Sequence, residues 1–96
     1  MHSIDLPNPP EIENLKVLAL ERTEKRIESG IETRIWVGTM LGLFELRDGP
    51  DGLALIRTLG PRDGLPSSYI SSLRADRDGD IWVGTDAGLA LVHVPD

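Results

Sequence analysis

An acidic segment, Asp76-Arg77-Asp78-Gly79-Asp80, contains the residues that are best spaced for metal chemistry, because three carboxylates alternate along it. Alternating carboxylates are typical of calcium loops, but an EF-hand loop also requires glycine at its sixth position and glutamate at its twelfth. Counted from Asp76, these positions hold Ile81 and Ala87. The sequence therefore favours a turn with solvated aspartates, and it predicts neither a metal nor another cofactor.

The other polar residues that could act in catalysis do not form a recognisable catalytic pattern. His2 and His93 lie far apart in the sequence, and neither has the acidic neighbour expected of a zinc or catalytic pair. The serines between positions 67 and 72 lack the Gly-x-Ser-x-Gly elbow of a hydrolase nucleophile. The charged run Glu21–Glu28 mixes both signs, as an exposed hairpin or helix face does. We therefore expect a protein that is not an enzyme.

Composition excludes several further classes. The chain has 96 residues and a net charge of −6, with 16 acidic and 10 basic residues, so binding to nucleic-acid phosphates is not expected. The absence of cysteine excludes disulfides and thiolate metal sites. No apolar run approaches the ~20 residues that span a bilayer, and no signal peptide is expected. The length corresponds to one small domain or to part of a larger one.

The elements that must position these residues are indicated by an internal repeat. The pentapeptide Ile35-Trp36-Val37-Gly38-Thr39 recurs without change as 81–85, at an offset of 46 residues, and includes both tryptophans of the chain. A Gly-Leu pair follows in the same register, at 42–43 and at 88–89. A period near 46 lies between the ~40–45 and ~50 residues of known propeller blades.

The segments around each pentapeptide have strand and turn patterns. In the second copy, 69–75 and 81–85 flank an Asp78-Gly79 pair, which predicts a hairpin with a type I′ turn; a third strand, 89–94, ends at Pro95. In the first copy, 53–59 supplies a further outer strand. The predicted fold is all-β: two four-stranded antiparallel meander blades of a β-propeller, the second missing its outer strand in cis.

These patterns divide the chain into three parts. We expect an N-terminal extension at 1–14, a first blade at 15–60 and a partial second blade at 61–96. The extension could add a strand, for example through Ile4-Asp5-Leu6.

Residues 8–33 leave two interpretations open. A helix could start at Asn8-Pro9-Pro10 and close at Ser29-Gly30, since apolar residues between them keep roughly helical spacing. Alternatively, 16–22 is the strand that the repeat register requires, followed by a lengthened, charged hairpin over 23–33. The repeat favours the strand.

The repeated residues have structural roles in this interpretation. Each tryptophan is expected to fill the wedge between neighbouring blades, where burial of ~150–250 Å² stabilises the fold; the alternative is an indole that stacks on a sugar ring. The glycines permit close approach or a bend, and the threonines hold the following turn. The structural repeat positions are Trp36, Gly38, Thr39, Gly42, Trp82, Gly84, Thr85, Gly88, Asp78 and Gly79.

Together, Gly64-Leu65-Pro66-Ser67-Ser68, Asp78-Gly79-Asp80, 81–85 and Gly88-Leu89 resemble the two-component regulator propeller repeat. The resemblance covers 63–94 and the second half of the motif at 35–46. It implies a ligand-sensing segment of a bacterial sensor, often a hybrid histidine kinase, whose periplasmic propeller detects ligands such as oligosaccharides. The implied partners are further blades in cis or other copies of the chain.

Two other functions remain open on the sequence. A self-assembling two-blade chain could be a lectin-like carbohydrate-binding module, with three or four copies closing a ring. A propeller lyase of the streptogramin type has similar tryptophan-glycine patterns, but it needs a general base, and the histidines available are His2 and His93.

Overall fold

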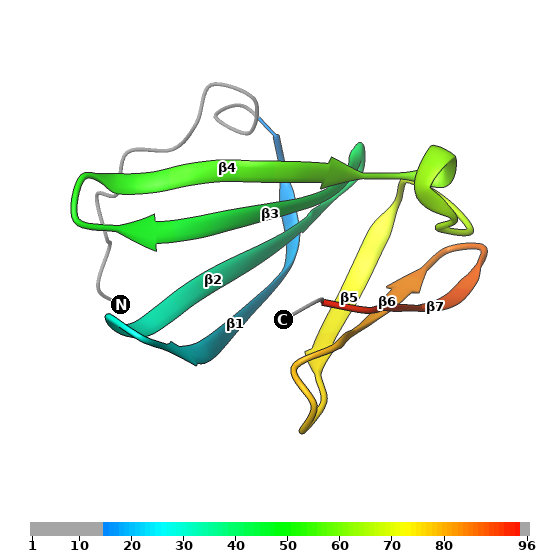
Figure 1. Ribbon diagram of the computed structural model, residues 1–96. Helices are drawn as coiled ribbons and strands as arrows, with labels where there is room; N and C mark the ends of the chain where they lie inside the picture. Colours follow the sequence, from blue (N-terminus) through cyan, green and yellow to red (C-terminus); the bar gives the residue numbers. More distant parts are fainter. Residues whose placement is uncertain (1–14, 95–96) are drawn as a thin grey trace, which may run out of the picture.

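The computed structural model describes residues 15–94 and contains two antiparallel sheets (Figure 1). The first sheet has the order β1-β2-β3-β4 and the second the order β5-β6-β7. The strands are β1 (Val17–Ile27), β2 (Gly30–Thr39), β3 (Gly42–Gly49), β4 (Gly52–Leu59), β5 (Ile70–Ala75), β6 (Ile81–Thr85) and β7 (Gly88–Val92). The predicted all-β fold, with one four-stranded meander and a second sheet of three strands, is confirmed.

The strand interpretation of 16–22 is confirmed over the helix. β1 pairs with β2 along its whole length, from Val17 opposite Thr39 to Ile27 opposite Gly30. Pairing continues through the segment expected to form a lengthened hairpin, and the chain reverses over the two residues between Ile27 and Gly30. Gly30 has φ +139, a region that side-chain-bearing residues avoid. Two residues are therefore enough to form the turn between β1 and β2, and the charged residues 21–27 belong to β1.

The hairpin predicted at Asp78-Gly79 forms, but the expected type I′ turn is wrong. Gly79 has φ +84, whereas no described residue other than glycine has positive φ, so Asp78 does not meet the type I′ requirement. The turn is longer, because β5 and β6 are paired as far as Ala75 and Ile81. Backbone bonds from Gly79 N to the carbonyl oxygen of Asp76 (3.1 Å) and from Asp76 N to that of Asp80 (2.9 Å) close it.

The connection between the sheets contains a short 3-10 helix, η1 (Pro61–Asp63). The Asp63 side chain accepts a hydrogen bond from Gly60 N (2.9 Å), and Gly64 ends the segment at φ +99. Leu65 follows and is buried. This compact turn brings β5 against β1 and β2.

The main core lies between the two sheets. The first sheet contributes Trp36, Leu43 and Leu59, and the second unit contributes Leu65, Ile70, Ile81 and Val83. A smaller buried cluster, Val37, Phe44 and Leu46, lies on the opposite face of the first sheet. Side chains alternate between the two faces of a strand, which is why Trp36 and Val37 belong to different clusters.

The two equivalent tryptophans differ in burial. Trp36 is fully buried, as predicted, whereas Trp82 is 40% exposed, so the prediction that Trp82 is buried between blades is wrong for this chain. Ile81 and Val83 point toward the first sheet, and alternation places Trp82 on the opposite face. Within residues 15–94, only the first sheet packs against the second. Burial of the indole therefore depends on a neighbouring sheet, which Trp36 has and which Trp82 lacks among residues 15–94.

The predictions for the N-terminal extension, 1–14, lie outside the described residues, as do the helix start at Asn8, the added strand at 4–6, His2 and Pro95. Within residues 15–94 there is no helix that is long and apolar enough to cross a membrane.

Candidate functional site

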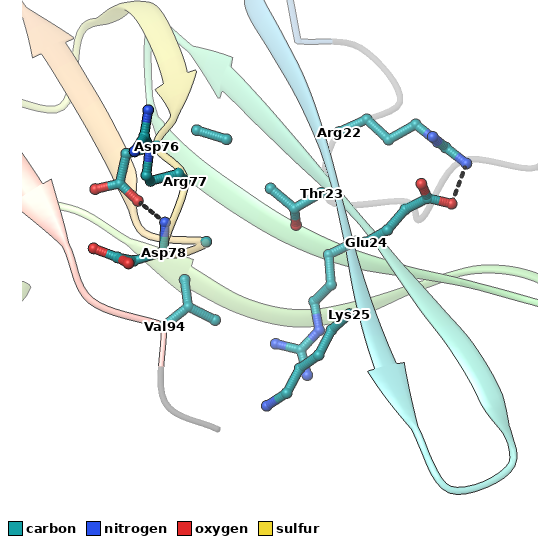
Figure 2. Close-up of a pocket in the computed structure, with 11 residues that line it drawn as sticks. Arg22, Thr23, Glu24, Lys25, Asp76, Arg77, Asp78 and Val94 are labelled. Atoms are coloured by element: carbon teal, nitrogen blue, oxygen red, sulfur yellow. Dashed lines mark hydrogen bonds and ion pairs between the residues drawn. The ribbon is translucent and has the colours of Figure 1, made fainter.

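A cleft of about 470 Å³ opens between the two sheets, where β1 faces the hairpin that joins β5 and β6. Figure 2 shows Thr23 and Lys25 on the side of β1 that faces this hairpin, and Arg22 and Glu24 pointing to the other side. The opposite wall is the hairpin from Ala75 to Gly79, together with Val94. The cleft thus has a polar wall with cationic groups on one side and, on the other, a turn that carries Asp76, Arg77 and Asp78.

An ion network on β2, β3 and β4 fixes one of these cations. Glu45 is fully buried between the sheets, where it accepts hydrogen bonds from Arg34 and from Arg57 Nε (2.5 Å). Arg34 also donates from Nε to Glu32 (2.9 Å). Burial opposes the charge on Arg34, but its bonds to Glu32 and Glu45 outweigh this effect and raise the pKa of the guanidinium. Arg34 is therefore a charged group held at the cleft wall.

Sequence reasoning missed Glu45, although a signal was present. Its strand reads Gly-Leu-Phe-Glu-Leu, and the position 46 residues later holds Leu91. The register pairs Glu45 directly with Trp36, so both side chains point into the space between the sheets. A carboxylate on the same face as the buried tryptophan requires cationic partners, which β2 and β4 supply.

Two further polar contacts join the strands beside the cleft. Trp36 Nε1 donates to the Thr23 hydroxyl (3.2 Å). This bond places the edge of the buried indole against Thr23, which lines the cleft. The Glu21 carboxylate accepts from Ala75 N (2.8 Å), a contact between β1 and β5. The bond between Ala75 and Glu21 joins the two walls of the cleft on this side, whereas the bond between Trp36 and Thr23 lies within the first sheet.

Two of the three alternating aspartates, Asp76 and Asp80, stabilise the hairpin with their side chains. Asp76 Oδ1 accepts from the backbone N–H groups of Asp78 (2.8 Å) and Asp80 (3.1 Å). Asp80 Oδ1 accepts from Val94 N (3.0 Å). In the part of the chain that the structure describes, no group of three or more acidic or histidine side chains is arranged to hold a metal. Asp76 and Asp80 thus stabilise the turn and its junction with the last strand.

His93 has an acidic neighbour that the sequence order did not reveal. Its Nδ1 lies 3.0 Å from Asp80 Oδ1, although the imidazole is largely exposed. The Val94 N–H lowers the pKa of Asp80 most, and His93 lowers it further. Alternation along β7 and beyond places His93 on the Trp82 side of the sheet, away from the cleft that Val94 lines.

The repeated turn has the same hydrogen bonds in both sheets. Thr39 Oγ1 donates to the Gly42 carbonyl (2.9 Å) and accepts from Leu41 N (3.0 Å). Thr85 Oγ1 makes the corresponding bonds to Gly88 (2.8 Å) and from Ala87 (3.1 Å). The following glycines share a positive φ, +132 and +142. The expectation that the threonines hold the turns agrees with this geometry.

The sequence from the loop after η1 to the turn after β6 matches a known family model. Residues 64–87 match the two component regulator propeller. This segment is similar to a two component regulator propeller repeat. A comparison with curated proteins found no match to the chain. The two component regulator propeller is a family of structural repeats and not of catalytic domains.

The propeller repeat spans one wall of the cleft and part of the core. It includes Ile70, Ile81 and Val83, which pack against the first sheet, and the 75–79 hairpin that lines the cleft. The equivalent glycines Gly38 and Gly84 have different neighbours. A Cβ at Gly38 would lie 2.7 Å from Ile70 Cγ2 in the other sheet, whereas a Cβ at Gly84 would meet only Ser72 of its own sheet. Gly38 therefore permits close approach between the two sheets.

Proposed function

We propose that this chain is a ligand-recognition segment of a sensor propeller in a bacterial two-component system, acting without catalysis and outside the cytoplasm. The observation that carries the proposal is the propeller repeat at 64–87, whose sheet packs on an equivalent sheet with the same Trp-Val-Gly-Thr strand and the same turn. Repeats of this kind stack into a ring, and ligands are recognised where several blades converge.

The cleft between the two sheets is the part of the recognition site that we assign to this chain. Its volume of about 470 Å³ lies in the range of small-molecule sites, about 300–1,000 Å³. Thr23, Lys25 and Arg34 offer a hydroxyl, an ammonium and a guanidinium along one wall. Such groups recognise ligands rich in hydroxyl and carboxylate oxygens, such as oligosaccharides.

The contacts of Asp76 and His93 support recognition over the lyase alternative. Asp76 is engaged with backbone N–H groups of its own turn, which leaves it unsuited to accept a proton from a substrate. His93 is paired with Asp80 on the face away from the cleft. A lyase would need a general base that faces the bound substrate.

Binding can be tested by titrating the chain with two probes, maltohexaose and a hexamer of galacturonic acid, followed by amide chemical shifts. We expect the galacturonate hexamer to shift residues 23–25 and 75–79, and Lys25→Ala to weaken binding by about tenfold, as for a charged hydrogen bond. The matched control, Lys16→Ala, changes an exposed lysine outside the cleft and should leave affinity unchanged. Shifts confined to other surfaces, or equal effects of both variants, would contradict the assignment.

A further inference from the structure

A second cleft, here called the outer cleft, has a volume of about 370 Å³ and is lined in part by Ile27, Glu32, Arg47 and Ala54. Register and alternation place these four side chains on the face of the first sheet that packs against the second sheet. In Figure 1 the turn between β3 and β4 lies at the end of the first sheet that is away from β5, β6 and β7. The outer cleft is therefore on the same face as the cleft between the sheets and further along it.

Four residues paired across the first sheet connect the two clefts. The register places them in one row, in the order Thr23, Arg34, Arg47 and Ala54. Thr23 and Arg34 line the cleft between the sheets, and Arg47 and Ala54 line the outer cleft. With about 4.8 Å between neighbouring strands, the row is about 14 Å long. A ligand longer than one sugar ring can therefore lie in both clefts at once.

The middle of this row holds two cations, because Arg34 and Arg47 are directly opposite each other. Like charges in this arrangement destabilise a sheet. Two carboxylates compensate Arg34: Glu32 accepts from its Nε (2.9 Å) and lies 2.7 Å from its Nη2, and Glu45 accepts from its Nη1. By contrast, the exposed side chain of Arg47 has neither a hydrogen bond nor an ion pair among the residues that the structure describes.

The acidic residues of the outer cleft do not neutralise Arg47. Glu32 is already held by Arg34. Asp48 is the next residue along β3, so alternation directs its side chain to the other face of the sheet. Asp51 lies in the exposed turn between β3 and β4. The junction of the two clefts therefore carries a positive charge that no described carboxylate compensates.

We propose that Arg34 and Arg47 form an anion-binding subsite between the two clefts, and that this subsite takes a carboxylate of an acidic oligosaccharide lying in both. Glu32 and Glu45 use three of the five N–H groups of Arg34, so two remain to donate, beside those of Arg47. A carboxylate between the two guanidinium groups accepts from both and removes their repulsion. The inference rests on the proposed function for the location of the site, and it adds a second cleft and a requirement for charged sugars.

The test measures amide chemical shifts and affinities with three probes: the galacturonic acid hexamer, its methyl ester and sodium sulfate. We expect the hexamer to shift residues 47–54 and 75–79 with the same dependence on concentration, because one ligand occupies both clefts. Arg47→Gln should weaken binding of the hexamer by about tenfold, as for the loss of a charged hydrogen bond. The methyl ester keeps the sugar chain without its charges, so it should bind the natural chain and Arg47→Gln equally.

The matched control, Arg74→Gln, removes the same charge from another exposed arginine on a strand. Arg74 pairs with Trp82, so its side chain lies on the face of the second sheet away from both clefts. This variant should leave the affinity for the hexamer unchanged. Equal effects of Arg47→Gln and Arg74→Gln would attribute the loss to net charge and overturn the proposal.

Thermal unfolding without ligand gives an independent readout of the two opposed arginines. Because Arg47→Gln removes one of two like charges, it should raise the midpoint slightly or leave it unchanged at low salt. A lower midpoint would show that Arg47 stabilises the fold and would argue against a subsite kept for a ligand.

The binding outcomes separate this proposal from the proposed function. Shifts at 75–79 without shifts at 47–54, together with a silent Arg47→Gln, would refute the subsite and leave the cleft between the sheets as the site. Shifts at 47–54 that Arg47→Gln abolishes, without shifts at 75–79, would support the subsite and contradict the proposed function. Absence of binding by the hexamer would refute both. If sulfate alone shifts 47–54 at the concentrations at which the hexamer does, the pair binds a free inorganic anion and the assignment to an oligosaccharide is wrong.

Discussion

Replacing each tryptophan with alanine separately tests whether the two sheets share one core. Trp36 and Trp82 occupy equivalent positions in identical pentapeptides, so local sequence and strand propensity are matched between them. They differ in the neighbour they contact: Trp36 is fully buried between the sheets, and Trp82 is 40% exposed on the open face. The difference in stability between the two variants therefore reports inter-sheet packing together with the hydrogen bond from Trp36 Nε1 to Thr23.

The expected magnitudes follow from buried area. A fully buried tryptophan removes ~150–250 Å² from water, worth ~4–6 kcal/mol at ~25 cal/mol per Å². Measured Trp→Ala losses are ~3–5 kcal/mol, so we expect about 4 kcal/mol for Trp36→Ala. Trp82 buries less than two thirds of its surface, and water can fill the space it leaves, which gives about 2 kcal/mol for Trp82→Ala.

The assay is urea unfolding followed by far-UV circular dichroism, with Trp36→Phe and Trp82→Phe as milder variants. A loss of about 4 kcal/mol approaches the whole stability of many small domains. If Trp36→Ala is unfolded in water, the phenylalanine pair still gives the order of the two effects. Equal losses at the two positions would refute the inter-sheet core.

Three further predictions follow from single contacts. Gly38→Ala should destabilise the fold by about 1–3 kcal/mol in urea unfolding, because the added Cβ overlaps Ile70; a neutral effect would disprove the close approach. The pKa of the Asp80 carboxyl lies below its usual range in the folded chain, so the stability that this carboxylate contributes is present above that range and is lost as pH falls below about 4. Asp80→Asn should therefore make the urea midpoint less dependent on pH between about pH 2 and 6. An unchanged pH dependence in this variant would contradict the role of Asp80. Glu45→Gln should cost about 2 kcal/mol, since the charged bonds to Arg34 and Arg57 are lost, and a stabilised variant would contradict the network.

The fold could be predicted because its signals are local and repeated. The pentapeptide at 35–39 and 81–85 marks equivalent strands, and the Gly-Leu pair places the next turn at a fixed distance. The threonine bonds in both turns follow directly from that spacing. Even in the ambiguous segment 16–22 the repeat register favours the strand, although the apolar spacing of that segment suits a helix as well as a strand.

The burial and pairing of particular residues could not be predicted from local pattern. Trp82 has the same neighbours in sequence as Trp36, yet its exposure depends on which sheet packs on it. The partners of Glu45 lie on different strands and meet only through the sheet register. Likewise, Asp80 and His93 are brought together by the β6–β7 pairing and not by any motif.

The main core contains residues from both sides of the connection at 60–69, so the two sheets should unfold together. Neither sheet encloses a sufficient apolar interior alone, since Trp36 and Leu43 of one are covered by Ile70 and Val83 of the other. Cleavage in the connection should therefore not release two independently folded halves. The chain should melt in one cooperative transition, with the nearest-neighbour interface acting as the unit of stability, as in other linear arrays.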